Sequence, residues 1–179
     1  MKKISFYSAA IAILAASAIL NGCGGSQNTN TASTDTTKIY TPPPAPPYDP
    51  NAIDAKAPVI TLDLSADGNT MADMKYTPTT LTVKSGSTVK INFKNNGKDE
   101  SMQHNFVLVK NGTAEAVATA AINIDNHIPP SADVLYGIPA TKPGSLTVIT
   151  FAAPPIGTYQ YICTYPGHWQ KMQGTFIVQ

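Results

Sequence analysis

Short stretches in which apolar and polar residues alternate dominate the chain from residue 57 to its end. Such alternation puts every second side chain on one face, as expected of a half-buried β-strand. The clearest case is Thr88 to Lys94, where Val89, Ile91 and Phe93 share one face. Strands are predicted over residues 59–64, 80–84, 88–94, 104–110, 146–151, 158–162 and 175–178.

Turn-forming residues separate the predicted strands, as in Ser85-Gly86-Ser87 and Asn111-Gly112. The alanine-rich stretch from Ala114 to Ala121 is the one place where the sequence favours a short helix. Seven or so short strands with turns between them are typical of a sandwich of two sheets. We therefore predict an all-β fold, a Greek-key β-sandwich with one short helical insertion.

The N-terminal part of the chain has a different pattern. Lys2 and Lys3 precede an uncharged apolar run from Ile4 to Leu20, and small residues then lead to Cys23. This order of charged, apolar and small segments is the signature of an export signal. We expect a signal peptide over residues 1–22. The run is close to the roughly 20 residues that a spanning helix needs, so a retained membrane anchor is the alternative.

A polar segment follows the predicted signal peptide. Residues 24–37 contain almost no apolar side chains, and residues 42–47 are nearly all proline. The polar stretch has too little apolar surface to order itself, and the prolines favour a stiff, extended chain. We expect a lipidated cysteine and disordered linker over 23–56 and a folded domain over 57–179. A binding site for a partner that recognises polyproline is the alternative to a spacer.

Charge excludes one class of partner. The chain has a net charge of +1, and all 12 of its basic residues are lysines. Recognition of phosphate and guanine depends heavily on arginine. Nucleic acid is therefore not an expected partner. Residues 57–179 hold equal numbers of lysines and acidic residues, which favours docking through an apolar patch in a small, transient interface.

Candidate chemistry is concentrated near the C-terminus. The strand predicted over 158–162 leads into Cys163, and Pro166-Gly167 predicts a turn before the last strand. Cys163, His168 and Met172 should therefore lie on one loop at one end of the sandwich. Thiolate, imidazole and thioether are donors that copper accepts, and His104 on an earlier strand adds a second imidazole.

Two other interpretations of Cys163 stay open. Free cysteine is among the most buried residue types, so it could be an inert core thiol. It could also form a nucleophilic pair with His168. An acyl-transfer enzyme would need an orienting group and an oxyanion hole as well, and the surrounding Cys-Thr-Tyr-Pro-Gly loop offers no candidate for either.

The sequence resembles the azurin and auracyanin branch of the cupredoxins over about residues 57–179. The similarity is carried by His104-Asn105, Cys163-Thr164-Tyr165-Pro166-Gly167-His168, Met172 and Gly174, with Met74-Lys75-Tyr76 and Leu81-Thr82-Val83 upstream.

The resemblance implies one type 1 copper ion, with three equatorial ligands and one axial ligand. The equatorial ligands would be His104, Cys163 and His168, and the axial ligand would be Met172. This is the recognised blue-copper set of two histidines, a cysteine and a weakly bound methionine.

The residues around the ligands also have implied roles. Asn105 is expected to hydrogen-bond the ligand loop, with Thr164 beside it, and the Tyr165 N–H to point at the Cys163 sulfur. Gln103 stands where azurins have a glycine whose carbonyl approaches the metal, so that contact is open here. The domain also lacks the cysteines for the azurin disulfide.

Leu20 to Cys23 resembles a bacterial lipobox, which implies that Cys23 becomes the lipidated first residue of the mature protein. Stable anchoring takes more than one acyl chain, as a diacylated or triacylated cysteine would provide. The expected location is therefore outside the cytoplasm, anchored by lipid to a bacterial membrane and facing the periplasm.

The function implied by the resemblance is one-electron transfer rather than catalysis. The expected partners are redox proteins such as cytochromes or other copper or haem enzymes, and the protein is expected to be a monomer. Electrons would enter and leave through the edge of His168. The alternative is a periplasmic copper-handling protein, either a chaperone or a store.

Several residues have simpler interpretations. His127 lies in a loop without partner spacing and is predicted to be solvated. Trp169 is either core or an exposed docking aromatic, and Met74 and Met102 are either core or part of an apolar rim around His168. Core packing is predicted for the aromatic residues Tyr159, Tyr161 and Phe176.

Overall fold

The structure is a computed structural model that describes residues 47–179, all within one compact unit. The predicted signal peptide, Cys23 and the linker up to residue 46 lie outside the described residues. Within residues 47–179, no helix has the length and apolar character needed to cross a bilayer. The elements are β1 (Val59–Asp67), β2 (Lys75–Thr77), β3 (Thr80–Val83), β4 (Thr88–Asn95), β5 (Val107–Lys110), α1 (Ala114–Ala121), β6 (Val134–Gly137), β7 (Leu146–Ala152), β8 (Gly157–Ile162) and β9 (Gln173–Val178).

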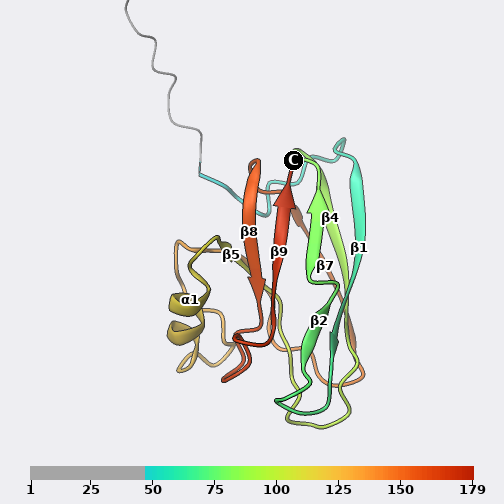
Figure 1. The fold of residues 1–179 in the computed structure, drawn as a ribbon. Helices are drawn as coiled ribbons and strands as arrows, with labels where there is room; N and C mark the ends of the chain where they lie inside the picture. The colour runs from blue at the N-terminus through green and yellow to red at the C-terminus, as the bar shows by residue number, and fades with distance from the viewer. Residues whose placement is uncertain (1–46) are drawn as a thin grey trace, which may run out of the picture. The chain divides into compact units, whose positions relative to one another are not determined.

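Two β-sheets make up the fold (Figure 1). The four-stranded sheet has the order β2-β1-β4-β7, and the five-stranded sheet has the order β3-β9-β8-β5-β6. Two neighbouring pairs are parallel, β1 with β4 and β3 with β9, and the other pairs are antiparallel. The predicted β-sandwich with one short helix is confirmed.

The core lies between the sheets and is rich in aromatic residues. Val89, Ile91 and Phe93 of β4 are fully buried, as their alternation predicted. Burying side chains of this size contributes about 1.5–3 kcal/mol each. The core predictions for the aromatic residues are confirmed, because Tyr161 and Phe176 are buried and Tyr159 packs against the same cluster.

Helix α1 covers the outer face of the five-stranded sheet, beside β5 and β8 (Figure 1). Its Val117 and Ala118 pack against Val107 and Val109 of β5 and Ile162 of β8. Strand β5 is therefore buried on both faces. This explains why its sequence is a continuous apolar run rather than an alternating one.

The structure corrects the predicted strands in three places. The strand expected over 104–110 begins only at Val107, because His104 instead makes an isolated backbone bridge to Thr141. Strand β6, with the sequence Val134-Leu135-Tyr136-Gly137, was not predicted. Strand β2 was not predicted either, and it pairs with the far end of β1 through Ala66 and Tyr76.

The residues before β1 pack against the end of β7. The Tyr48 hydroxyl donates to the Ala152 carbonyl at 2.7 Å, and the Ala152 N–H donates to the Pro50 carbonyl at 2.8 Å. Thr88 is paired with Ala152 at this end of the sandwich. Cys163 follows the opposite end of β8, whose six residues span about 20 Å.

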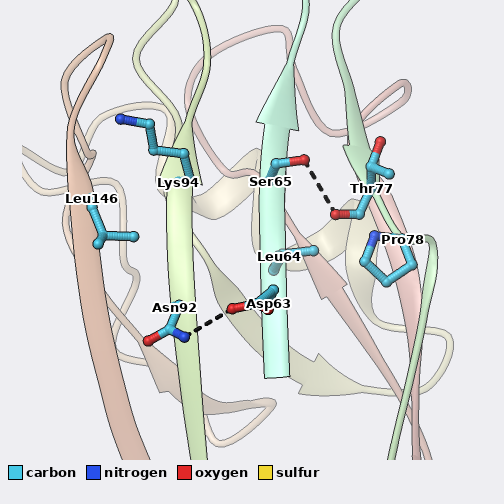
Figure 2. A pocket seen from close by; sticks show the side chains of 8 residues that line it. All are labelled: Asp63, Leu64, Ser65, Thr77, Pro78, Asn92, Lys94 and Leu146. Atoms are coloured by element: carbon cyan, nitrogen blue, oxygen red, sulfur yellow. Dashed lines mark hydrogen bonds between the residues drawn. The ribbon is translucent and has the colours of Figure 1, made fainter. Parts of the chain in front are cut away.

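A shallow groove on the outer face of the four-stranded sheet is shown in Figure 2. Two hydrogen bonds lie along it: Asn92 donates to Asp63 at 2.8 Å, and the Ser65 hydroxyl lies 3.3 Å from the Thr77 carbonyl. None of its eight lining residues belongs to the predicted metal site. The groove is therefore separate from the chemistry described below.

Gly174 supplies a test of how the Tyr161 ring packs over the neighbouring strand. It lies opposite Tyr161 in the β8–β9 pair, and a Cβ at this position would be 2.1 Å from the Tyr161 ring. Gly174→Ala must displace the ring, so we expect a loss of about 1–3 kcal/mol in the free energy of unfolding. Thermal unfolding followed by circular dichroism should show a midpoint at least about 4 °C lower.

Gly157→Ala is the matched control, because a Cβ there meets Tyr159 only at 3.4 Å, an ordinary contact. It lies in the same strand pair. Equal melting temperatures for the wild type and Gly174→Ala would contradict the packing described here.

Candidate metal centre

Three donor atoms meet where β8 ends. The sulfur of Cys163 lies 3.8 Å from Nδ1 of His104 and 3.7 Å from Nδ1 of His168. The two Nδ1 atoms are 3.2 Å apart. Within residues 47–179, His104, Cys163 and His168 form the one group of three or more His, Cys, Asp or Glu side chains that could hold a metal ion.

These separations fit a single metal ion. First-row metal ions bind imidazole nitrogen at about 2.0 Å and thiolate sulfur at about 2.3 Å. Donors placed at about 120° around one ion would then be roughly 3.5–3.7 Å apart, close to the three distances found here. The donor chemistry, two imidazoles and a thiolate, suits copper.

The interior around the donors is dry. His104 and Cys163 are fully buried and His168 is 2% exposed. Burial, helped by the neighbouring His168, lowers the pKa of His104 to about 4, and burial lowers the pKa of His168 to about 4. Both imidazoles are therefore neutral near pH 7, with a lone pair available to a metal.

Without a bound cation, burial disfavours ionisation of the Cys163 thiol. Burial raises the pKa of Cys163 to about 11, although the backbone N–H groups of Asn105 and Tyr165 act in the opposite direction. A bound cation would reverse this balance, because a coordinating thiol is deprotonated. A buried, neutral thiol beside two neutral imidazoles is therefore suited to a metal ion.

The C-terminal loop is folded tightly by its own backbone. The Cys163 N–H donates to the Met172 carbonyl at 3.0 Å, and the Met172 N–H donates to the His168 carbonyl at 2.9 Å. Gly167 has φ +81°, a conformation that side chains disfavour, and it allows the turn before His168. The fully buried Met172 is therefore held on the same loop as Cys163 and His168.

Asn105 joins this loop to the segment that carries His104, just before β5. Its Oδ1 accepts from the Thr164 N–H and its Nδ2 donates to the Thr164 hydroxyl, both at 2.8 Å. Both residues are buried, so these bonds are protected from water. They fix the residues that follow His104 and Cys163 against each other, and so help to set the spacing of the donors.

Comparison with known proteins agrees with a copper-binding site. The family described as copper binding proteins, plastocyanin/azurin family, matches residues 62–179, about two thirds of the chain. The chain belongs to this family. It is a cupredoxin of the azurin/auracyanin branch, and its cofactor is copper.

Auracyanins are among its similar relatives. Auracyanin-A of Chloroflexus aurantiacus is 38% identical over 125 residues, covering 66% of this chain and 74% of the relative. The structure of dithionite-reduced auracyanin from Roseiflexus castenholzii has a TM-score of 0.60 at 34% identity, covering 66% of this chain and 96% of that one. The structure of auracyanin A, described as a "blue" copper protein, gives a TM-score of 0.59 at 38% identity, covering 68% and 99%.

The cupredoxin structure thus brings His104, Cys163 and His168 together. The backbone N–H groups of Asn105 and Tyr165 lie near the sulfur, and Thr164 is bonded to Asn105. Gln103 is half-buried and directly precedes His104. Nε2 of His104 has no hydrogen-bond partner among the described residues.

The prediction that His127 is solvated was wrong. Its side chain is half-buried, with the ring centre 5.1 Å from that of Tyr165. Its backbone carbonyl accepts a hydrogen bond from the Thr164 hydroxyl, and its Nδ1 lies 3.3 Å from the Ala121 carbonyl. His127 also has φ +55°, which is uncommon for a residue other than glycine. The loop after α1 therefore supports the metal-binding loop.

Asn95 directly follows the strand predicted over 88–94, and it is fully buried. Its Nδ2 donates at 2.8 Å to the carbonyls of Met102 and Thr141, and its Oδ1 accepts from the Gly97 N–H. Met102 lies two residues before His104 in the sequence, and Thr141 is joined to His104 by the backbone bridge. Asn95 thus braces the segment that presents His104. A buried asparagine of this kind has no local sequence signal.

The open questions about Trp169 and the methionines are also answered. Trp169 is half-buried against the cluster under α1, so it contributes to packing. Met74 and Met102 are buried, and Met74 belongs to the main core. The methionine that is exposed near the ligand loop is Met71, whose methyl group approaches Gly167.

Proposed function

We propose that this cupredoxin is a one-electron carrier with one copper ion bound by His104, Cys163 and His168 and, axially, by Met172. The observation that carries the proposal is the convergence of two imidazole nitrogens and one sulfur within 3.8 Å in a buried site. When bound, copper supplies a redox couple, Cu(II)/Cu(I). The similarity to auracyanin A, a "blue" copper protein, supports the same function.

The chain's contribution is rigidity and the exclusion of water. His104 is fixed by its backbone bridge to Thr141, and Cys163 by its bond to the Met172 carbonyl. Ligands that cannot move keep nearly the same geometry in both oxidation states of the metal. Little energy is then spent on rearrangement when an electron arrives or leaves.

Burial argues against the two alternative functions. An enzymatic nucleophile must reach its substrate, but Cys163 is fully buried and burial raises its pKa to about 11. A copper chaperone needs ligands that exchange readily, and all four proposed ligands are at most 2% exposed. A carrier that keeps its metal fits these observations better.

Electrons are proposed to pass through the edge of His168, under the exposed turn of Pro166 and Gly167. The partly exposed Met71 lies beside Gly167 and extends this surface. Because residues 57–179 hold equal numbers of lysines and acidic residues, the domain suits a small, transient contact with a redox protein such as a cytochrome or another copper or haem enzyme.

The proposal also includes a membrane tether. A signal peptide over 1–22 would be removed, Cys23 would carry lipid, and a linker over 23–56 would separate the membrane from a cupredoxin domain over 57–179. The protein would act as an exported monomer facing the periplasm. Support comes from the order of charged, apolar and small residues before Cys23.

Cys163→Ser tests the metal centre directly. The copper-loaded full chain should absorb strongly in the visible range through a thiolate-to-copper transition, and the variant should lose this band. Because serine is similar in size, far-UV circular dichroism should still show a folded domain, with a cost of about 1–3 kcal/mol for the buried hydroxyl. A colourless wild type, or a variant that keeps the band, would rule out the proposed centre.

Met172→Leu tests the axial role of the thioether. Loss of a weak electron donor should favour the reduced metal, so the reduction potential should rise while copper stays bound. We expect a change of about tenfold in the ratio of Cu(II) to Cu(I) at fixed potential, which is about 59 mV. Met74→Leu, a buried core methionine, is the control and should leave the potential unchanged. The same potential in both variants would mean that Met172 is not axial.

Cys23→Ser tests the tether. The full chain made in a bacterial host should sediment with membranes and be released only by detergent, whereas Cys23→Ser should not carry lipid. Cys163→Ser is the matched control, because it removes the other cysteine and should leave the membrane association intact. If Cys23→Ser stayed as firmly bound as the wild type, the run from Ile4 to Leu20 would be a retained anchor instead.

A further inference from the structure

Tyr76 is a buried polar residue next to the metal centre. It lies on β2 at the edge of the four-stranded sheet, where Lys75 and Thr77 on either side are exposed. Its own side chain is 1% exposed and packs with its ring centre 5.2 Å from that of Tyr161 and 6.2 Å from that of Phe93. A tyrosine hydroxyl in such a position must find a partner or be costly to bury.

The partner is the backbone of Asn105. The Tyr76 hydroxyl donates to the Asn105 carbonyl at 2.5 Å, across 29 residues of sequence. Burial raises the pKa of Tyr76 well above its ordinary value, so the phenol keeps its proton and remains a donor. Tyr76 therefore holds the segment next to His104 from the core side.

Asn105 is thereby bonded on every side. Its side chain bonds twice to Thr164, and its backbone N–H points at the Cys163 sulfur. Thr164 in turn donates to the carbonyl of His127. The network runs from the core at Tyr76, through the residue after His104, to the ligand loop and the loop that follows α1.

The Tyr76 side chain also neighbours the Cys163 thiol, because each of the two groups shifts the pKa of the other. The single proton of the Tyr76 hydroxyl is donated to the Asn105 carbonyl. This O–H dipole lies in an interior where electrostatic effects are stronger than in water. Phenylalanine at this position would fill the same space without that dipole.

We propose that Tyr76 is a positioning residue for the copper centre. Its hydroxyl fixes Asn105 against the ligand loop. The Asn105 backbone N–H is thereby held toward the Cys163 sulfur, which raises the reduction potential. Hydrogen bonding around the cysteine sulfur is a recognised control on the potential of such sites, because it draws electron density away from the oxidised metal. The inference rests on the copper centre proposed above.

Tyr76→Phe tests this in the copper-loaded full chain in detergent, by a redox titration followed in the visible spectrum. The potential should fall, so that the ratio of Cu(II) to Cu(I) at fixed potential rises by several-fold to about tenfold, where tenfold is about 59 mV. The thiolate-to-copper band should also shift in energy.

Tyr161→Phe is the matched control. Tyr161 is a buried tyrosine in the same aromatic cluster, and its hydroxyl donates at 2.6 Å to a backbone carbonyl, that of Pro78, away from Asn105. A purely structural role predicts similar effects of the two changes on stability and on the potential. Our inference predicts that Tyr161→Phe changes the Cu(II) to Cu(I) ratio by less than twofold.

Placing 3-fluorotyrosine at position 76 gives a second test that keeps the volume and the hydroxyl. The fluorinated phenol is a stronger donor, so the potential should rise above that of the wild type, opposite to Tyr76→Phe. Unchanged potentials in both Tyr76 variants, or equal shifts in Tyr76→Phe and Tyr161→Phe, would overturn the role of Tyr76. An absent visible band in the wild type would instead overturn the copper centre itself.

Discussion

The arrangement on which the structure depends is the close approach of three lone-pair donors in a dry interior. Two imidazole nitrogens and a sulfur lie 3.2–3.8 Å apart, all on side chains that are at most 2% exposed. A cluster of this kind is unfavourable in the chain alone and favourable around a cation. Folding energy from elsewhere must therefore hold His104, Cys163 and His168 together until metal binding offsets the cost.

The sandwich supplies that energy through long-range packing. Its aromatic core includes Phe93, Phe106 and Phe151, all fully buried, and α1 closes the outer face of the five-stranded sheet. Strand β8 then delivers Cys163 where β9 begins, and the two strands form one antiparallel pair through Gly174. The metal loop is thus a connection between two adjacent strands, and its ends cannot separate without breaking the sheet.

Local pattern and spacing predicted what depends on local interactions. The helix from Ala114 to Ala121 was predicted with the bounds that the structure has, and the donors were found because Cys163, His168 and Met172 are close in sequence. The supporting residues escaped prediction because their partners are distant. Tyr76 reaches across 29 residues and the Thr164 hydroxyl across 37, so neither contact leaves a periodic or local trace. Strand β6 is short and at a sheet edge, where alternation over four residues is a weak signal.

Those distant contacts share one feature that bears on electron transfer. Asn95, Asn105 and Thr164 are buried polar residues whose side chains bond to backbone or to each other on both sides of the donor cluster. A buried polar network is costly when incomplete and rigid when complete, so it favours one arrangement over near alternatives. Hydrophobic packing alone fixes positions less strictly, because apolar side chains can slide with little loss. The network is therefore the part of the fold that converts a stable sandwich into a centre whose ligands keep their positions when the charge on the metal changes.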